Sequence, residues 1–433
     1  MDVVIPGNFY EMVKSNEGEE SACNVRTPSV KVLAADVVQF PRTTELFYSN
    51  VEKFSGRVLG VVQNKYVVLD RTAFYPEGGG QVNDSGSLMY VNSKNNAKKV
   101  RYVVKIAGVV LHEVESAASF KKGMKVNGIV DIERRKTIAR HHTATHIVNA
   151  ACRGLLWQHI LQAGSYKDEE KAHLDITHYR RITNEELEAI ERRVNEIIRS
   201  DLPIATNVLL RNKAEEKFGF RLYQGGAVPG KELRVVSIGD IDHEAYGGTH
   251  HMLKSTGEIG PFKLVKRESV QDGIERLVYK TGDAAVRYVQ EREQLLHEAC
   301  SVLSVSEGEL VRSVERFFTE WKEQRKKLEA LSELVVREEA REIIKEGTIK
   351  PVFKVVDLDS TVIRKLGMMV AESESAAACI INKQGNIVCA AGEKSNQSAR
   401  KMIEKSIAQL GGSGGGSDRI AQGKVEKVGM VEL

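Results

Sequence analysis

Two histidines one helical turn apart are the first residues in this sequence whose types and spacing suggest chemistry. The segment His142-Thr-Ala-Thr-His146 lies in a stretch, 133–156, that has a helical pattern of apolar residues. Spacing of i, i+4 places both imidazoles on one helix face, which suits two ligands of one zinc ion. Thr143 follows where a metalloprotease motif has glutamate, so that motif is excluded. Spacing alone does not exclude an alternative, in which this is the basic start of a helix that contacts only solvent or RNA. The basic residues of this helix start are Arg134, Arg135, Lys136 and Arg140.

A second histidine pair follows two glycines in Tyr246-Gly-Gly-Thr-His250-His251. A Gly-Gly turn lets the backbone come close to a ligand. This segment could therefore supply a third metal ligand, and a fourth, to the site that His142 and His146 begin. The alternative is a simple turn between two strands.

Two glycine-rich stretches could also bind polar ligands. In the stretch 69–81, LDRTAFYPEGGGQ, Thr72 offers a hydroxyl and Gln81 an amide beside a sharp turn, and a plain hairpin is the alternative. The stretch 411–419, GGSGGGSDR, has the composition of a flexible linker. It follows a predicted helix close to the chain end, so we also consider a loop whose exposed amides bind phosphate. The residues of this second candidate site are Gly411, Gly412, Gly414, Gly415, Gly416 and Arg419.

The elements around these residues follow a mixed pattern. Short β-branched runs from residue 54 to 131 predict a small sheet or barrel. After the histidine helix, a second helix is predicted to begin at Thr183 and to end before Pro203. Glu186, three residues after Thr183, completes a capping box with it. Strand-like segments at 232–241 and 260–270 then make this part α/β.

The remainder is predicted to be helical and then α/β. Residues 284–347 are rich in charge, and Ser306 with Glu309 forms a further predicted capping box. Apolar residues there keep a 4,3 spacing, broken by Gln324, that is typical of the seam of a helical hairpin or coiled coil. A helix packed on its own domain explains them too. The seam residues are Leu310, Val314, Phe317, Trp321, Leu328, Leu331 and Val335. Residues 349–433 alternate strands and helices.

Composition places few limits on function. The 433 residues are 42% hydrophobic and 28% charged, as in ordinary globular proteins, and a net charge of +4 permits a nucleic-acid partner without requiring one. No apolar run reaches the roughly 18 to 20 residues of a membrane span, so we expect no membrane partner. The scattered cysteines predict free thiols in a reducing, cytoplasmic setting. They are Cys23, Cys152, Cys300, Cys379 and Cys389.

Taken together and in order, these motifs resemble the C-terminal half of an archaeal-type alanyl-tRNA synthetase, over nearly the whole chain. The matching segments are LDRTAFYPEGGGQ, HHTATH, KAHLDITHYRRIT, GFRLYQGGAVPG, EAYGGTHH, SVQDGIERLVY and GGSGGGSDRIAQG. The segment IPGNFYEMV at 5–13 resembles the one that follows the aminoacylation and tRNA-recognition region. Since the class II catalytic domain is not recognised, we expect a shortened form or one product of a split synthetase.

The resemblance implies an α+β multidomain fold. It comprises a leading segment and linker (1–42), a small β-barrel (43–135), a zinc-dependent α/β editing domain (136–280), a long helical hairpin for dimerisation (281–348) and a small C-terminal α/β domain that binds tRNA (349–433). The implied partners are tRNA(Ala), a second copy of the chain in a homodimer, and a separate aminoacylation half.

The implied reaction is hydrolysis of the ester that joins a wrong amino acid, chiefly serine and also glycine, to the terminal adenosine of tRNA(Ala). By resemblance, Thr72 reads the serine hydroxyl and Gln81 helps to shape the pocket. His142, His146 and His250 match the zinc-site histidines, and the zinc either activates water or fixes the aminoacylated adenosine.

The family pattern breaks at Tyr246, where a zinc-ligand cysteine is usual. Cys152 lies on a different helix face from His146 and so does not obviously replace the missing cysteine ligand. Three histidines with an open water position would still form a catalytic zinc site, which is the outcome we favour. The alternatives are ligation by His251 or by a deprotonated Tyr246, or loss of the metal with impaired or metal-free editing.

Three readings of function follow. The chain is a deacylase acting on mischarged tRNA(Ala), or a tRNA-binding and dimerisation subunit with weakened editing, or a free-standing editing protein with a long C-terminal extension. The segments IPGNFYEMV and LYQGGAVPG favour the synthetase over the third reading, and an unrelated zinc hydrolase is remote.

Overall fold

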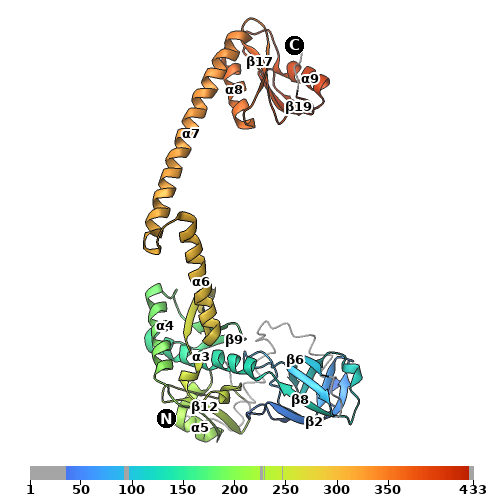
Figure 1. Ribbon diagram of the computed structural model, residues 1–433, viewed down its shortest axis with the longest axis vertical. Coiled ribbons are helices and arrows are strands. Elements are labelled where there is room, and N and C mark those ends of the chain that lie inside the picture. Colours follow the sequence, from blue (N-terminus) through green and yellow to red (C-terminus); the bar gives the residue numbers. More distant parts are fainter. Residues whose placement is uncertain (1–35, 92–96, 225–227, 229, 246, 429–433) are drawn as a thin grey trace, which may run out of the picture. The chain divides into compact units, whose positions relative to one another are not determined.

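The computed structural model describes residues 36–91, 97–224, 228, 230–245 and 247–428 (Figure 1). The chain divides into two compact units, 1–295 and 296–433, each described by itself below. Both mix helices with sheets, as expected. Within the described ranges, no helix combines the length and apolar character that crossing a bilayer requires. The boundaries of the five predicted domains stay predictions.

Six strands of the first unit form a sheet that closes on itself, the arrangement of a small barrel. The order around this ring is β2-β3-β7-β6-β5-β8, and alternate side chains point inward to a core that includes Val58, Val67, Leu88 and Val103. The short strands β1 (Thr44–Glu45) and β4 (Arg71–Thr72) pair beside it. The ring strands are β2 (Lys53–Val62), β3 (Tyr66–Leu69), β5 (Gly86–Tyr90), β6 (Lys98–Ile106), β7 (Val109–Val114) and β8 (Lys125–Val130).

Helix α3 (Ile132–Leu156) follows the ring and is the central element of the first unit (Figure 1). The Asp131 side chain caps its first turn by accepting from the Arg134 backbone N–H. Arg135, fully buried, donates Nε to the Asp84 carboxylate at 3.0 Å. This arginine therefore ties the start of α3 to the ring, which argues against a basic helix start that contacts only solvent or RNA.

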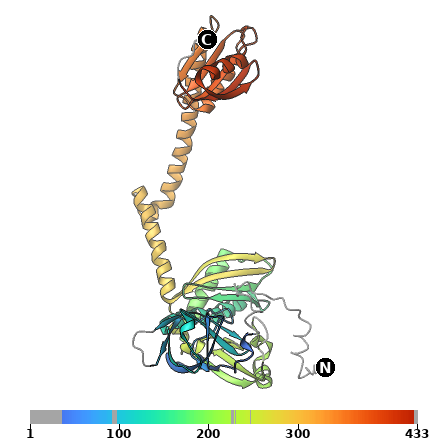
Figure 2. The ribbon, with the colours of Figure 1, turned by 90° about the vertical axis from the view of Figure 1, so that its right-hand side faces the viewer.

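Two antiparallel sheets surround α3. One has the order β14-β15-β10-β9, and Figure 2 shows its long β14–β15 pair in yellow; the other has the order β11-β12-β13. Helix α4 (Asn184–Arg199) packs on α3 and begins with the predicted capping box of Thr183 and Glu186. The strands are β9 (Gln162–Lys167), β10 (Ala172–Thr177), β11 (Ile204–Leu210), β12 (Glu232–Ile238), β13 (Asp242–Ala245), β14 (Phe262–Gln271) and β15 (Ile274–Thr281).

The second unit holds a five-stranded sheet between helices. Its order is β16-β17-β18-β20-β19, and alternate residues of β17 pack on α8 on one face and on α9 on the other. The strands are β16 (Val352–Val356), β17 (Ala377–Asn382), β18 (Asn386–Ala391), β19 (Gly412–Gly416) and β20 (Ile420–Val425). The helices are α8 (Ser360–Glu372) and α9 (Ala399–Leu410).

The charge-rich stretch forms two helices, α6 (Gly282–Leu303) and α7 (Leu310–Gly347). Between them, the Glu309 carboxylate accepts from the backbone and hydroxyl of Ser306, as predicted. The end of α7 packs on the sheet of its own unit through Val336, Ala340 and Ile343, whereas earlier seam residues such as Phe317 (61% exposed) and Leu328 (67%) face solvent. The hairpin and its role in dimerisation stay predictions.

The prediction of free thiols is wrong for two cysteines. Cys379 on β17 and Cys389 on β18 lie directly opposite each other in the antiparallel register, with Cα atoms 4.0 Å apart, and they form a disulfide. Cys152 and Cys300 are free and buried, and Cys23 lies outside the described residues. The cross-strand pairing that brings the two sulfurs together cannot be read from scattered sequence positions.

The prediction of a glycine-rich loop at 411–419 is also wrong. Residues 412–416 form the edge strand β19, which pairs antiparallel with β20, and all five of its residues are exposed. Gly411 instead ends α9 with a φ of 74°. The Arg419 Nη2 donates to the Ala371 carbonyl at 2.7 Å, so its guanidinium is held against α8.

Candidate metal centre

The three predicted zinc-site histidines come together in the first unit. His142 and His146 lie on α3, and His250 begins a short 3-10 helix, η3 (His250–Met252). One ring nitrogen of each lies within 4.8 Å of the others, and the Nε2 atoms of His146 and His250 are 3.3 Å apart. All three side chains are at most 3% exposed. The helical spacing of the first pair and the turn before the third thus converge as predicted.

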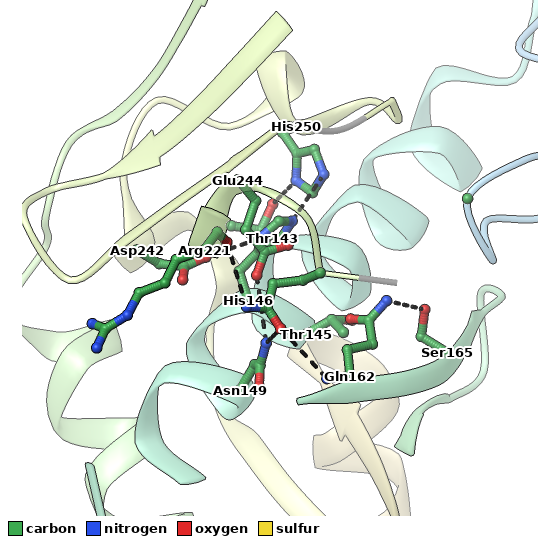
Figure 3. A network of polar contacts seen from close by, with 12 residues as sticks. Thr143, Thr145, His146, Asn149, Gln162, Ser165, Arg221, Asp242, Glu244 and His250 are labelled. Atoms are coloured by element: carbon green, nitrogen blue, oxygen red, sulfur yellow. Dashed lines mark hydrogen bonds and ion pairs between the residues drawn. The ribbon is translucent and has the colours of Figure 1, made fainter. Parts of the chain in front are cut away.

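Each imidazole is held from behind by a different partner, and Figure 3 shows the partners of His146 and His250. The Nδ1 of His142 lies 2.8 Å from the Gln81 amide oxygen, and the Nδ1 of His250 lies 3.1 Å from the Thr143 hydroxyl. His146 Nδ1 lies 3.0 Å from a carboxylate oxygen of Asp242 and 3.0 Å from one of Glu244. Such outer partners orient the rings of metal-binding histidines.

These contacts assign the proton on two of the rings. The amide oxygen of Gln81 and the carboxylate of Asp242 can only accept, so Nδ1 of both His142 and His146 is the N–H donor. When such a ring is neutral, its lone pair is on Nε2, the nitrogen that would bind a metal. The donor set therefore fits a metal ion that takes imidazole nitrogen, as zinc does.

Burial and charge act differently on the three rings. Burial lowers the pKa of His142 and of His250 well below the usual range, so both are neutral at pH 7. Burial also acts to lower the pKa of His146, but the Glu244 and Asp242 carboxylates outweigh it and raise that pKa to about 9. A metal at this site would displace the extra proton of His146, so its binding should release protons.

The carboxylates behind His146 are not equivalent. Burial raises the pKa of Glu244, whereas contacts with His146 and Arg153 overcome burial and lower the pKa of Asp242. Arg153 donates Nη2 to the second oxygen of Asp242. Of the two carboxylates facing His146, Asp242 therefore keeps its negative charge to the lower pH.

Two glycines allow the chain to come this close. Gly248 has a φ of 109°, and a Cβ there would lie 2.6 Å from the His142 ring. Gly80 has a φ of 72°, and a Cβ there would lie 2.2 Å from the Ser165 carbonyl oxygen. A side chain at either position would push the turn away from the histidines.

Gln81 joins the glycine turn to the histidines. Its amide nitrogen donates to the Thr249 hydroxyl at 3.1 Å while its oxygen lies against His142. Its backbone bridges to Lys167 on β9, a buried lysine whose Nζ donates to Gly79 O and Ser165 Oγ. The two ends of the Gln81 amide are thus used for positioning His142 and Thr249.

Thr72 is buried, but its side chain contacts residues in and beside the six-stranded ring rather than the three histidines. Its Oγ1 lies 2.8 Å from His112 Nε2 and accepts from the Phe74 N–H. His112 Nδ1 faces the Val67 carbonyl, which can only accept, so Nε2 of neutral His112 accepts the Thr72 proton. The Thr72 oxygen therefore donates to His112 and keeps a further lone pair as an acceptor.

The other predicted ligands are not brought into this cluster. His251 is half-buried, and burial lowers its pKa to about 4, but it is outside the metal-binding groups found among the described residues. Cys152 lies in the apolar core beneath α3. Tyr246 lies outside the described residues.

Asp242, Glu244, Thr143 and Thr249 are site residues that the sequence reasoning missed. Asp242 and Glu244 occupy alternate positions of β13, and both are buried. Charged residues at buried positions of a strand need a partner; the sequence shows only two acidic residues alternating shortly before His250, and their burial is set by packing.

Comparison with known families matches two parts of the chain. Residues 1–134 match the model described as tRNA synthetases class II (A). Residues 233–278 match the model of the threonyl and alanyl tRNA synthetase second additional domain. The second match contains Asp242, Glu244 and His250 of the candidate metal centre.

Individual relatives agree with these models. The chain is 39% identical to the alanine–tRNA ligase of Pyrococcus furiosus, over 98% of this chain and 46% of the relative. It is 39% identical to that of Methanopyrus kandleri, over 98% and 47%, and 40% identical to that of Methanothrix thermoacetophila, over 99% and 46%.

This chain is homologous to the alanyl-tRNA synthetases. It spans about half the length of the curated relatives it matches, which is consistent with a C-terminal half. The similarity to alanine–tRNA ligases also covers His142 and His146, which lie outside both family models, because the relatives match nearly the whole chain.

Proposed function

We propose that this chain is the editing half of an alanyl-tRNA synthetase, an aminoacyl-tRNA deacylase that hydrolyses Ser-tRNA(Ala) and Gly-tRNA(Ala). The observation that carries the proposal is the cluster of three buried histidines, each with its own outer partner, partly within the segment that matches the second additional domain. Binding tRNA(Ala) and action in translation in the cytoplasm belong to the same proposal.

The chemistry of alanine explains why such a site is needed. A pocket for alanine cannot exclude smaller glycine by sterics and rejects an added hydroxyl poorly. Differences of this kind are worth only about 1–3 kcal/mol, so a second, hydrolytic site must complete the discrimination.

Zinc is the cofactor that this proposal implies. His142, His146 and His250 would hold it, with Tyr246, at the usual cysteine position, and His251 as the remaining candidates. When bound, zinc would supply either Lewis-acid activation of water or fixation of the aminoacylated adenosine. Three histidines leave a position for water or substrate, as catalytic zinc sites require.

The chain's own residues would prepare the substrate. Gln81 and Asp242 keep His142 and His146 in orientation, since each receives the Nδ1 proton of its ring. Thr72 would accept a hydrogen bond from the serine hydroxyl, because its own proton is given to His112. Burial of the histidines would keep bulk water from competing with the substrate.

The proposed domain roles follow the resemblance. The ring at 43–135 and the α/β part at 136–280 would act in editing, the helices at 281–348 in homodimerisation, and the sheet at 349–433 in tRNA binding. Residues 412–416 would contact tRNA as an exposed glycine edge strand rather than as a loop, with Gly411 and Arg419 beside it.

A second candidate function is a tRNA-binding and dimerisation subunit for a separate aminoacylation half, with weakened editing because of Tyr246. The exposed apolar seam of α7 favours it, since Phe317, Leu328 and Leu331 are more than half exposed. The two functions are compatible in one chain.

Deacylation of Ser-tRNA(Ala) by the purified chain with added zinc tests the proposal. We expect release of serine well above the buffer rate and little release from Ala-tRNA(Ala). Hydrolysis no faster than buffer would contradict the deacylase, and a monomer that fails to retard tRNA(Ala) on a gel would contradict the second function.

A further inference from the structure

An open pocket is lined by Asp242, whose carboxylate also contacts His146 of the candidate metal centre. Its volume is about 470 Å³, and it is formed by the end of α3, by α5 (Arg211–Phe218) with the adjoining η2 (Gly219–Leu222), and by the turn into β13. Arg221, which belongs to one of the segments that resemble the family but lies outside the metal centre, is part of the lining. This size is typical of a small-ligand site.

Three cations line the pocket. Lys217 and Arg221 are exposed, and Arg153 is 12% exposed at its side chain. Arg153 donates one nitrogen to Asp242, while its Nη1 is buried with no hydrogen-bond partner among the described residues. In Figure 3 the Arg221 side chain extends outward from the Asp242 side of the network. This grouping suits a phosphate group, which Arg and Lys bind through charge and hydrogen bonds.

The rest of the lining suits a ribonucleotide rather than an isolated anion. Phe218 stacks on His243 with ring centroids 4.4 Å apart, which gives an aromatic wall for a ribose or base. The Asp240 carboxylate also lines the pocket and is exposed. A carboxylate repels free phosphate but accepts a hydrogen bond from a 2′-hydroxyl, the group that distinguishes RNA from DNA.

We propose that this pocket binds a ribonucleotide of the tRNA acceptor strand, with Lys217 and Arg221 on its phosphate and Asp240 on its 2′-hydroxyl. The inference rests on the proposed function, because it takes tRNA as the substrate. The pocket is one side chain from His146, since Asp242 contacts both that ring and Arg153. A strand held there lies next to the site where its end would react.

Binding of a labelled acceptor-stem RNA hairpin to the full chain tests this assignment without turnover. Lys217→Gln and Arg221→Gln should each weaken binding about three- to tenfold and lower the slope of log affinity against log salt by about 1. The matched control is Lys213→Gln, the same charge change at an exposed position of the same helix outside the pocket. That control should bind like the parent chain.

A second arm compares RNA with DNA of the same sequence. Asp240→Asn should reduce the preference for RNA, whereas Lys213→Gln should leave it unchanged. Equal effects of Lys213→Gln and Lys217→Gln, or no effect of either, would overturn the proposal. Weakened binding of AMP with unchanged RNA binding would overturn it too, since the ligand would then be a free nucleotide.

Metal content and Ser-tRNA(Ala) hydrolysis of the same proteins separate this inference from the proposed function. If the parent chain binds the hairpin through Lys217 and Arg221 but hydrolyses nothing, the deacylase fails and the pocket stands. If it hydrolyses Ser-tRNA(Ala) and the pocket variants bind RNA normally, the pocket assignment fails alone.

Discussion

The histidine cluster and the glycine strand β19 were both singled out by local sequence, yet they are built in opposite ways. The cluster joins the glycine turn at 79–81, helix α3 and the segment 242–250, and its rings are buried with partners behind them. Strand β19 depends on β20 alone for its strand pairing, and all its residues are exposed. A change in the cluster should therefore propagate to the whole site, whereas a change in the strand should stay local.

Removal of one histidine should give the largest effect. His250→Ala should lose bound zinc and lower Ser-tRNA(Ala) deacylation by more than about a hundredfold, since even outer partners of metal ligands account for about ten- to a hundredfold. Metal analysis and initial rates provide the measurement. The control is His297→Ala, an exposed histidine on α6. A His250→Ala variant that kept both its zinc and its deacylation rate would show that the site does not depend on this histidine.

The two carboxylates behind His146 should differ. Asp242→Asn should weaken zinc binding about ten- to a hundredfold, and Glu244→Gln should weaken it less, because the pKa of Asp242 is lowered and that of Glu244 is raised. Competition with a chromogenic chelator measures both. Equal losses of zinc affinity, or a larger loss for Glu244→Gln, would contradict the stronger role assigned to the Asp242 carboxylate.

The pH dependence of stability tests the state of His112, the histidine that contacts Thr72. Burial lowers the pKa of His112 to about 4, so below the unfolded value of about 6.5 the unfolded chain binds a proton that the folded chain does not. The contribution of His112 to the free energy of unfolding is complete above pH 6.5. It decreases as the pH is lowered, by about 2 kcal/mol at pH 5.

Urea unfolding at pH 7 and pH 5 measures that loss. Because other buried histidines contribute, the informative quantity is the difference between the parent chain and His112→Gln. The variant should lose less stability between the two pH values. Identical losses would mean that His112 takes up a proton in the folded chain.

The smallest effects are expected in the glycine strand. A Cβ on Gly414 would lie 2.7 Å from Gly423 Cα, whereas a Cβ on Gly415 would meet nothing within 4 Å. Gly414→Ala should therefore lower the free energy of unfolding by about 1–3 kcal/mol, and Gly415→Ala should be close to neutral. Thermal unfolding of the full chain compares them.

The same two variants, Gly414→Ala and Gly415→Ala, also test whether β19 contacts RNA. Since packing does not require glycine at 415, weaker tRNA binding by Gly415→Ala would point to close approach of RNA. Unchanged deacylation by both variants is expected with a short acceptor-stem substrate. A large loss of deacylation would contradict the local character of β19.

The elements of the metal centre could be predicted where the residue type itself carries the chemistry. His142, His146 and His250 have a helical spacing or follow a glycine turn, and the capping boxes at Thr183 and Ser306 depend on neighbours in sequence. Asp242 and Glu244 were missed because their role depends on which face of β13 is buried, a fact set by packing against α3.

Other features depend on pairing between distant segments. Glycine has little strand propensity, so the composition of 411–417 indicated a loop, and only the pairing with β20 makes it a strand. The Cys379–Cys389 disulfide likewise follows from the register of β17 on β18. Gln81 was expected to shape a pocket, but its contacts with His142 and Thr249 are visible only in three dimensions.

The central claim is that the three histidines hold a zinc ion on which hydrolysis depends. The most direct measurement is zinc content per chain together with Ser-tRNA(Ala) deacylation, before and after a chelator and after zinc is restored. We predict one zinc per chain, loss of deacylation when zinc is removed, and recovery of both when zinc is restored. Full deacylation by a chain free of metal would contradict it.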